Sequence, residues 1–425
     1  MAPASKRILL GIAGLLVLLL VFTSAIFVWT IAPLGTRYIA KRMCSGVFVA
    51  ERAPESVWKS ELRSGSFGYP PSFGYEIDEA NKRVTASWNG MAVSTVAFRP
   101  ALGCTPVPEG EKLAAAPGSE HRVGYAEPFA FPPRIAASPA LAPALDWAFS
   151  DPKLRTRAVL VVHRGRLVAE RYAKGFDQDT PQMGWSMTKS VGNALIGTLV
   201  EAGSLRLDQD HLFPEWEDTE RAAITVEQLL QMSSGLAWDE SYDNPYGDAL
   251  QMLFGSDDAA RVALGKELRY PPGEVFEYSS GTSNLLGLLL KRTLMAATIE
   301  PLHYPQRALF GPLGMRTAVL EPDPRGTLVL SSFSYASGRD WARFGLLYLN
   351  DGVAGDRRIL PEGWAARACA PAAADASYGE HFWRDVSREG DPDLPSDTCH
   401  AAGHDGQYVT IVRSRELVVV RLGLT

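Results

Sequence analysis

The chain has 425 residues, of which 46% are hydrophobic and 21% are charged, with a formal net charge of −6 at pH 7. This length and apolar content are sufficient for one large domain and a smaller one, and the acidic balance argues against a nucleic-acid partner. The sequence has no His-Glu-x-x-His motif, no cluster of cysteine and histidine ligands and no glycine-rich phosphate loop. We therefore expect neither a metal nor another cofactor.

The amino-terminal residues contain a long apolar run. Lys6 and Arg7 precede residues 8–33, which carry no charge and are long enough to cross a bilayer. A cleaved signal peptide would have a shorter apolar core before its small-residue cleavage site, and here the run continues beyond such a site at residues 23–25. We predict that residues 1–34 form an uncleaved transmembrane anchor, with a cleaved signal peptide as the alternative.

The four cysteines indicate an oxidising compartment. They are even in number and have no metal-ligand neighbours. We predict the disulfides Cys44–Cys104 and Cys369–Cys399, although four cysteines also allow two other pairings. Because disulfides persist outside the cytoplasm, we expect a single-pass protein of the cell (inner) membrane whose residues after the anchor face the periplasm or the exterior.

Residues 35–105 predict a small β-rich module closed by the first disulfide. Residues 82–88 and 92–98 are strand-like, and the Asn-Gly pair at 89–90 is typical of a hairpin turn. A disulfide stabilises a module whose core is too small to be stable alone.

Residues 106–137 are rich in proline and alanine and predict an extended linker. In residues 138–425, strand-like segments stand at both ends and helical segments fill the middle. The strand-like segments are residues 157–163, 166–172, 407–412 and 417–422. This order predicts an α+β domain with one antiparallel sheet, flanking helices and a separate all-helical lobe.

Ser186 and Lys189 form the strongest chemical motif. They stand three positions apart at the start of an apolar helical run, so their side chains face the same side. A serine hydroxyl is a weak nucleophile until a base takes its proton, and a lysine kept neutral by burial is such a base. We expect Ser186 to be the nucleophile and Lys189 its base; the alternative is that Ser186 is a plain helix N-cap.

Two further motifs follow in chain order. Tyr278 and Ser280 lead into a second apolar helix, and His404 begins a His-Asp-Gly turn before strong β-formers. With these three motifs in this order, the chain resembles the serine β-lactamase and penicillin-recognising superfamily. Within that superfamily it is most similar to class C β-lactamase-like esterases and 6-aminohexanoate-oligomer hydrolases. The resemblance runs from about residue 138 to the last residue.

The resemblance implies a set of catalytic roles. Tyr278 would lie beside Ser186 and, with Lys189, would move the proton during attack and departure of the leaving group. The oxyanion would be held by the backbone amides of Ser186 and Gln407, and Gly406 would leave room for substrate at the strand edge. The alternative for Tyr278 is a hydrogen-bonded core tyrosine.

Departures from the family pattern narrow the substrate. Ser280 stands where β-lactamases usually have asparagine, and His404 stands where they usually have lysine. A neutral imidazole binds a substrate carboxylate less well than a cation does. The alternative for His404 is a structural turn histidine. A triad with Asp405 is disfavoured, because adjacent residues of a strand point to opposite faces.

The segment of residues 238–248 lies between the first two motifs and contains proline, glycine and several carboxylates. These residues predict a surface loop, positioned like the substrate-covering loop of the oligomer hydrolases. Tyr242 and Tyr246 are its candidate substrate contacts, and we expect most of the rest to be a solvated acidic segment.

Together these features predict a membrane-anchored serine hydrolase that cleaves ester or linear amide bonds of a small molecule through an acyl-enzyme on Ser186. The alternative within the same class is a β-lactamase or a D-Ala-D-Ala peptidase acting on cell-wall material. A third hypothesis is an acylated sensor or binding protein. The sequence does not predict the natural substrate or the oligomeric state.

Overall fold

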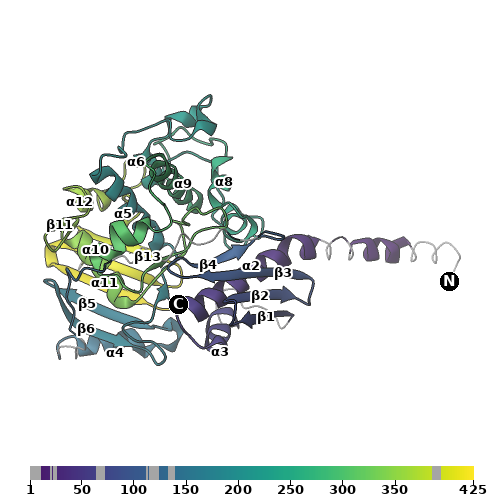
Figure 1. The fold of residues 1–425 in the computed structure, drawn as a ribbon, viewed down its shortest axis with the longest axis horizontal. Helices are drawn as coiled ribbons and strands as arrows, with labels where there is room; N and C mark the ends of the chain where they lie inside the picture. The colour runs from purple at the N-terminus through teal and green to yellow at the C-terminus, as the bar shows by residue number, and fades with distance from the viewer. Residues whose placement is uncertain are drawn as a thin grey trace.

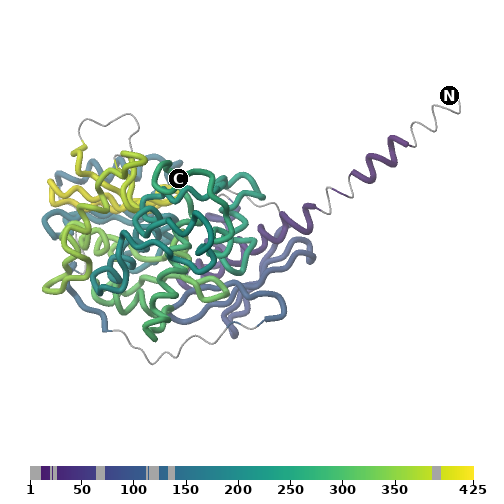
Figure 2. Tube along the Cα trace, turned by 90° about the horizontal axis from the view of Figure 1, so that it is seen from above, coloured from purple at the N-terminus to yellow at the C-terminus, as the bar shows by residue number. Residues whose placement is uncertain are grey.

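A computed structural model describes residues 11–19, 22, 26–63, 72–111, 113, 124–132, 139–384 and 394–425. The helical residues 11–19 extend away from the folded body, as Figures 1 and 2 show from two directions. Among the described residues, no helix is both long enough and apolar enough to cross a membrane. Because the run of residues 8–33 lies partly outside those described, the anchor stays a prediction.

A helix and a four-stranded antiparallel sheet form the amino-terminal module. The sheet has the order β1-β2-β3-β4, and helix α2 packs on β2 and β3. Its elements are α2 (Ala32–Cys44), α3 (Pro54–Val57), β1 (Phe73–Asp78), β2 (Arg83–Trp88), β3 (Ala92–Arg99) and β4 (Gly103–Val107). The predicted β2–β3 hairpin is confirmed, and Asn89 and Gly90 have the positive φ angles, 47° and 71°, that such a turn requires. Strands β1 and β4 were not predicted.

The module is joined to the rest of the chain through a buried carboxylate. Glu321 pairs with the Lys41 ammonium and accepts hydrogen bonds from Ser45 Oγ at 2.8 Å and from the Cys104 backbone N–H at 2.7 Å. The predicted Cys44–Cys104 disulfide is present and ties α2 to β4 beside this carboxylate. The apolar side chains of α2 belong to the same core as those of the following domain.

The large sheet has six antiparallel strands in the order β12-β13-β14-β15-β5-β6. They are β5 (Ala158–His163), β6 (Arg166–Tyr172), β12 (Trp383–Arg384), β13 (Thr398–Gly403), β14 (Gln407–Val412) and β15 (Leu417–Leu422). Both predicted hairpins are confirmed, and the pairing of β15 with β5 joins the two ends of the domain. Strand β13, which leads into the His-Asp-Gly turn, was not predicted.

Helices cover both faces of this sheet, as predicted. Residues of β5 alternate between the faces: Leu160 lies under α11, and Val159 packs with Leu145 of α4. Short helices gather with α9 beyond α5, away from the sheet (Figure 1). The helices are α4 (Ala142–Ser150), α5 (Met187–Glu201), α6 (Val226–Leu230), α7 (Asp248–Leu250), α8 (Ala259–Leu264), α9 (Ser280–Ala296), α10 (Gly311–Leu313), α11 (Gly338–Leu349) and α12 (Trp364–Ala368). Residues 133–138, at the predicted domain boundary, lie outside the described residues.

Two smaller sheets complete the fold. One has the order β7-β9-β8 and lies next to the start of α5, and the other is a two-stranded pair. Their strands are β7 (Gln182–Met183), β8 (Val319–Leu320), β9 (Ser334–Ala336), β10 (Val353–Ala354) and β11 (Arg357–Arg358). Strand β7 leads directly into the turn that carries Ser186.

Candidate active site

Ser186 stands on a tight turn between β7 and α5. Trp185 has a φ of +48°, in the left-handed region that bulky residues rarely adopt. The turn is held by a hydrogen bond from the Gly184 N–H to the Ser334 carbonyl at 2.8 Å. Although Ser186 is the N-cap residue of α5, its hydroxyl caps none of the helix amides in the described structure. The hydroxyl is therefore free of the plain capping role that the sequence left open.

Lys189 lies one helical turn further on and is buried. Its Nζ is 3.1 Å from Ser186 Oγ, 3.0 Å from Ser280 Oγ and 3.2 Å from the Ser331 carbonyl oxygen. A neutral amine has two N–H groups and one lone pair. If the N–H groups donate to Ser280 and Ser331, the lone pair is left to accept the proton of Ser186.

Glu240 is a site residue that the sequence analysis missed, because its loop was expected to be a solvated acidic segment. Its carboxylate accepts four hydrogen bonds: from Ser280 N–H at 2.8 Å, Ser280 Oγ at 2.5 Å, Trp238 Nε1 at 2.5 Å and Tyr242 OH at 2.6 Å. Because Ser280 Oγ donates to Glu240, its lone pairs are available to Lys189. Because the segment is irregular, no fixed period of side-chain direction applies to it, and the spacing of Trp238, Glu240 and Tyr242 did not predict their contact.

Tyr278 is brought to the same place by the segment before α9. Its ring lies 4.7 Å from Lys189 Nζ, measured to the ring centroid, and its phenol is near enough to Ser186 for the serine to influence its pKa. The ring also packs on Trp383, with centroids 5.3 Å apart. The three residues predicted to perform catalysis therefore converge.

The environment separates the proton affinities of these groups. Burial lowers the pKa of Lys189 to about 8, while the negative charge of Glu240 acts in the opposite direction. Burial, with a further contribution from Glu240, raises the pKa of Tyr278 above its ordinary value, and the interaction with Ser186 opposes this. The tyrosine therefore stays a neutral phenol that donates a proton, and Lys189 is the group suited to be the base.

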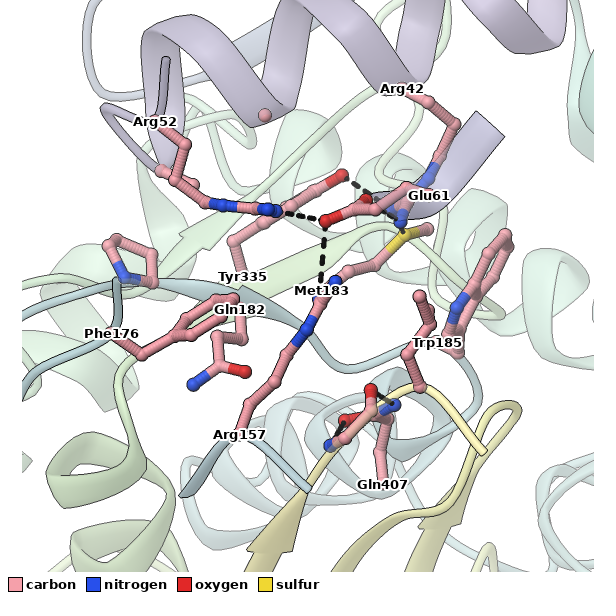
Figure 3. A pocket seen from close by; sticks show the side chains of 15 residues that line it. Arg42, Arg52, Glu61, Arg157, Phe176, Gln182, Met183, Trp185, Tyr335 and Gln407 are labelled. Atoms are coloured by element: carbon pink, nitrogen blue, oxygen red, sulfur yellow. Dashed lines mark hydrogen bonds and ion pairs between the residues drawn. The ribbon is translucent and has the colours of Figure 1, made fainter. Parts of the chain in front are cut away.

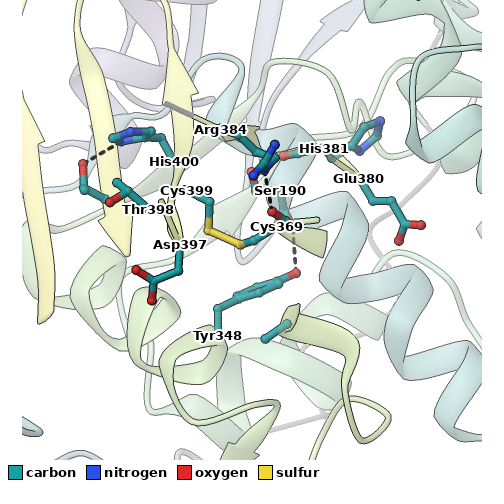
Figure 4. The surroundings of a disulfide bond; sticks show 12 residues. Ser190, Tyr348, Cys369, Glu380, His381, Arg384, Asp397, Thr398, Cys399 and His400 are labelled. Carbon is teal, nitrogen blue, oxygen red and sulfur yellow. Dashed lines mark hydrogen bonds between the residues drawn. A yellow bond between two sulfur atoms is a disulfide. The ribbon is translucent and has the colours of Figure 1, made fainter. Parts of the chain in front are cut away.

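Strand β13 contacts α5, and the Cys369–Cys399 disulfide lies near Ser190 of that helix (Figure 4). This second predicted pairing is also present, and it ties α12 to β13. His381 lies nearby and is buried; its Nδ1 is 2.8 Å from the Lys189 carbonyl oxygen. Burial lowers the pKa of His381 to about 3, so the ring is neutral and donates to this carbonyl.

The His-Asp-Gly motif forms the turn between β13 and β14, and this corrects the expectation that His404 and Asp405 point to opposite faces. Asp405 has a φ of +61°, so the pair does not alternate as in a strand, and His404 Nε2 lies 3.4 Å from Asp405 Oδ1. At Gly406, a side chain would collide with Arg421, since a Cβ would lie 2.1 Å from its Nη1. The φ of Gly406 is +74°, in the region that favours glycine, so the turn itself accounts for this residue, and room for a substrate at the strand edge stays a prediction.

Gln407 and His404 face different surroundings. The Gln407 side chain donates to the carbonyl oxygens of His404, Asp405 and Gly423 and lies in the cavity behind Trp185 (Figure 3). The His404 ring packs edge-on against Trp185, with centroids 5.7 Å apart, and lines the pocket at Ser186. The backbone N–H of Gln407 as an oxyanion donor stays a prediction.

The two tyrosines of the loop at residues 238–248 differ in their position relative to Ser186. Tyr242 lines the pocket beside Ser186 and lies 6.1 Å from the His404 ring, between centroids. Tyr246 is 55% exposed and is not among the described residues that line this pocket. Of the two candidate contacts, the structure brings only Tyr242 to the nucleophile.

Comparisons with known proteins identify the family and the fold of the chain. A family model described as Beta-lactamase matches residues 147–423. The chain is 25% identical over 239 residues to the 6-aminohexanoate-dimer hydrolase of Paenarthrobacter ureafaciens, covering 53% of this chain and 60% of that protein. It therefore spans less than two thirds of the length of this relative.

Two solved structures share the fold. A family VIII carboxylesterase superposes with a TM-score of 0.55 at 15% identity, covering 69% of this chain and 93% of its own. A penicillin-binding protein homologue from Caulobacter crescentus superposes with a TM-score of 0.54 at 18% identity, covering 68% of this chain and 93% of its own. These likenesses confirm a mixed fold of antiparallel sheets and helices, as expected from the motifs.

Proposed function

The chain belongs to the beta-lactamase family and is a serine hydrolase, and we propose that it cleaves ester or linear amide bonds through an acyl-enzyme on Ser186. The observation that carries the proposal is the position of Lys189. Its Nζ has acceptors for two N–H groups at Ser280 and Ser331 and a third neighbour, Ser186 Oγ, at 3.1 Å. A lysine held in this way is a base for that hydroxyl.

The proposed reaction proceeds in two halves. Lys189 takes the proton of Ser186 as Oγ bonds to the substrate carbonyl carbon, and the carbonyl oxygen takes the negative charge. When the bond to the leaving group breaks, the phenol of Tyr278 protonates that group, and the Lys189 ammonium returns a proton to Tyr278. Water then attacks the acyl carbon, releasing the acid and restoring Ser186.

The lining of the pocket supports an uncharged substrate. The described residues around it are six apolar or aromatic side chains with Ser186, Ser332 and His404, and they include no lysine or arginine. A carboxylate-bearing substrate such as a penicillin would lack a permanent cation there.

We further propose that the enzyme is held in the cell membrane by residues 1–34 and faces the periplasm or the exterior. The two disulfides support this location, because such bonds persist in oxidising compartments. Thiol labelling of protein taken directly from cells tests the compartment: we expect no labelling before reduction. Labelled cysteines in the untreated protein would contradict the location.

Activity profiling of the full chain tests the function. We expect turnover of p-nitrophenyl acetate and of a short linear amide, slow turnover of nitrocefin, and loss of all three in Ser186→Ala. Mass spectrometry should detect an acyl adduct on the Ser186 peptide. Rapid nitrocefin turnover would favour the β-lactamase or peptidase alternative, acylation without product release would favour the sensor, and full activity of Ser186→Ala would refute the nucleophile.

A further inference from the structure

The pocket beside Ser186 is small and apolar. Its described lining consists of Tyr38, Trp185, Tyr242, Leu250, Leu253 and Phe254, together with the three polar residues Ser186, Ser332 and His404. The cavity volume is about 20 Å³. A cavity needs roughly 10–15 Å³ to hold one water-sized group, so this pocket has room for a group about the size of a methyl.

The position of the pocket identifies which part of a substrate it receives. Ser186 lines it, whereas Lys189 and Tyr278 are not among its described lining residues. During the proposed reaction the leaving group must reach the phenol of Tyr278. The pocket therefore lies on the other side of the scissile carbonyl and receives the acyl group.

One wall of this pocket comes from outside the residues matched by the family model. Tyr38 belongs to α2 of the amino-terminal module, whereas the family model begins at residue 147. The Tyr38 side chain is buried, and its ring meets Phe254 edge-on, with centroids 5.1 Å apart. The module is thus part of the substrate site and not only an attachment to it.

The helix that carries Tyr38 is fixed against the nucleophile turn. Arg42, one turn after Tyr38, lies over the Trp185 ring at 5.1 Å and pairs with the buried Glu61. Glu61 also pairs with Arg52 and Arg157, so this one carboxylate forms ion pairs with three guanidinium groups near the turn that carries Ser186 (Figure 3). This cluster leaves the Tyr38 ring little freedom to move out of the pocket.

We propose that Tyr38 determines acyl-chain specificity: its ring closes the acyl pocket at about the length of an acetyl group. This inference rests on the proposed function. In a hydrophobic pocket one methylene changes kcat/KM by roughly 10- to 200-fold. The full-length enzyme should therefore hydrolyse p-nitrophenyl acetate at least about tenfold better than the butyrate, by kcat/KM.

Substitution of Tyr38 tests the proposal through this ratio of acetate to butyrate. Tyr38→Ala opens the wall, because a large-to-small substitution leaves apolar space that an apolar group fills. We expect its ratio to fall at least about tenfold. Tyr38→Leu, which keeps apolar contacts, should lower the ratio by less. It replaces the alanine variant in the test if that variant does not fold. Tyr38→Phe keeps the ring and should leave the ratio unchanged, as should Tyr246→Ala, which removes an exposed tyrosine of the nearby loop.

The outcomes separate this inference from the proposed function. If Ser186 reacts with a fluorophosphonate probe and hydrolyses esters, but Tyr38→Ala and Tyr38→Leu keep the wild-type ratio, the role of Tyr38 is wrong and the proposed function stands. If all variants lose activity on both esters in parallel, with the ratio unchanged, Tyr38 is structural and the proposal is overturned. If neither ester is cleaved through Ser186, the proposed function itself is refuted.

Discussion

The protonation state of Lys189 should control the rate of acylation. Burial lowers its pKa from an ordinary 10.5 to about 8, a difference of 10.5 − 8 = 2.5. At pH 7 this difference increases the neutral fraction about 300-fold, from roughly 0.03% to roughly 9%. Because the neutral amine is the base, kcat/KM should rise about ninefold between pH 6 and 7 and level off above about pH 9.

The charge of Glu240 offers a specific perturbation of this profile. Glu240 raises the pKa of Lys189, so Glu240→Gln should move the inflection of the profile to lower pH. The amide replaces the carboxylate with little change in shape. Its oxygen retains the N–H donors of Ser280 and Trp238, and the two hydroxyl groups that now face its NH₂ rotate to accept.

The assay is the kcat/KM for p-nitrophenyl acetate between pH 5.5 and 9.5, with spontaneous hydrolysis subtracted at each pH. Glu277→Gln is the matched control, because Glu277 pairs with Arg269, whereas among the described residues Glu240 is the charge that raises the pKa of Lys189. A wild-type profile that is flat from pH 6 to 9, or an inflection that Glu240→Gln leaves in place, would refute the assignment of Lys189 as the base.

Two substitutions test other parts of the structure. Tyr278→Phe removes the proton donor and should lower kcat/KM by about 10²- to 10⁴-fold in the same ester assay, with folding checked by circular dichroism; undiminished turnover would contradict the role. Glu61→Gln leaves Arg42 and Arg157 buried without their counter-charge and should cost about 3–5 kcal/mol in urea unfolding. The pKa of Glu61 is lowered to about 2 from 4.5, so its stabilisation is present above pH 4.5 and is lost as the pH falls towards 2. An unchanged unfolding midpoint in Glu61→Gln at pH 7 would show that the cluster contributes nothing.

The features predicted from sequence are those fixed by local geometry. Ser186 and Lys189 meet because three residues make nearly one turn of helix α5. The β2–β3 and β5–β6 hairpins follow from turn residues that accept a positive φ, as Asn89, Gly90 and Gly165 do here. Tyr278 was placed by family resemblance, since no local rule brings it to Ser186.

The features missed depend on contacts between distant segments. Glu240 belongs to a loop whose composition indicates a solvated surface, and its two hydrogen bonds from Ser280 form only because α9 begins beside this loop. The contact of His404 with Asp405 depends on one backbone angle, a φ of +61°, that the strand pattern did not predict. Tyr38 precedes the family-matched residues altogether, so motif spacing carries no information about it.

The buried pair of Lys41 and Glu321 shows how far the catalytic domain depends on the module. Burial lowers the pKa of Lys41, while the neighbouring carboxylate opposes this, so the pair is maintained only as long as both partners are present. Lys41→Met alone leaves the buried Glu321 carboxylate without its counter-charge, and it should lower the free energy of unfolding by about 3–5 kcal/mol. The double variant Lys41→Met, Glu321→Gln removes both charges and should recover most of this loss, since Ser45 and the Cys104 N–H still donate to the amide oxygen. If the double variant is no more stable than the single one in urea unfolding, the module is held by shape and disulfide, and the electrostatic coupling between α2 and the catalytic domain is not a determinant of stability.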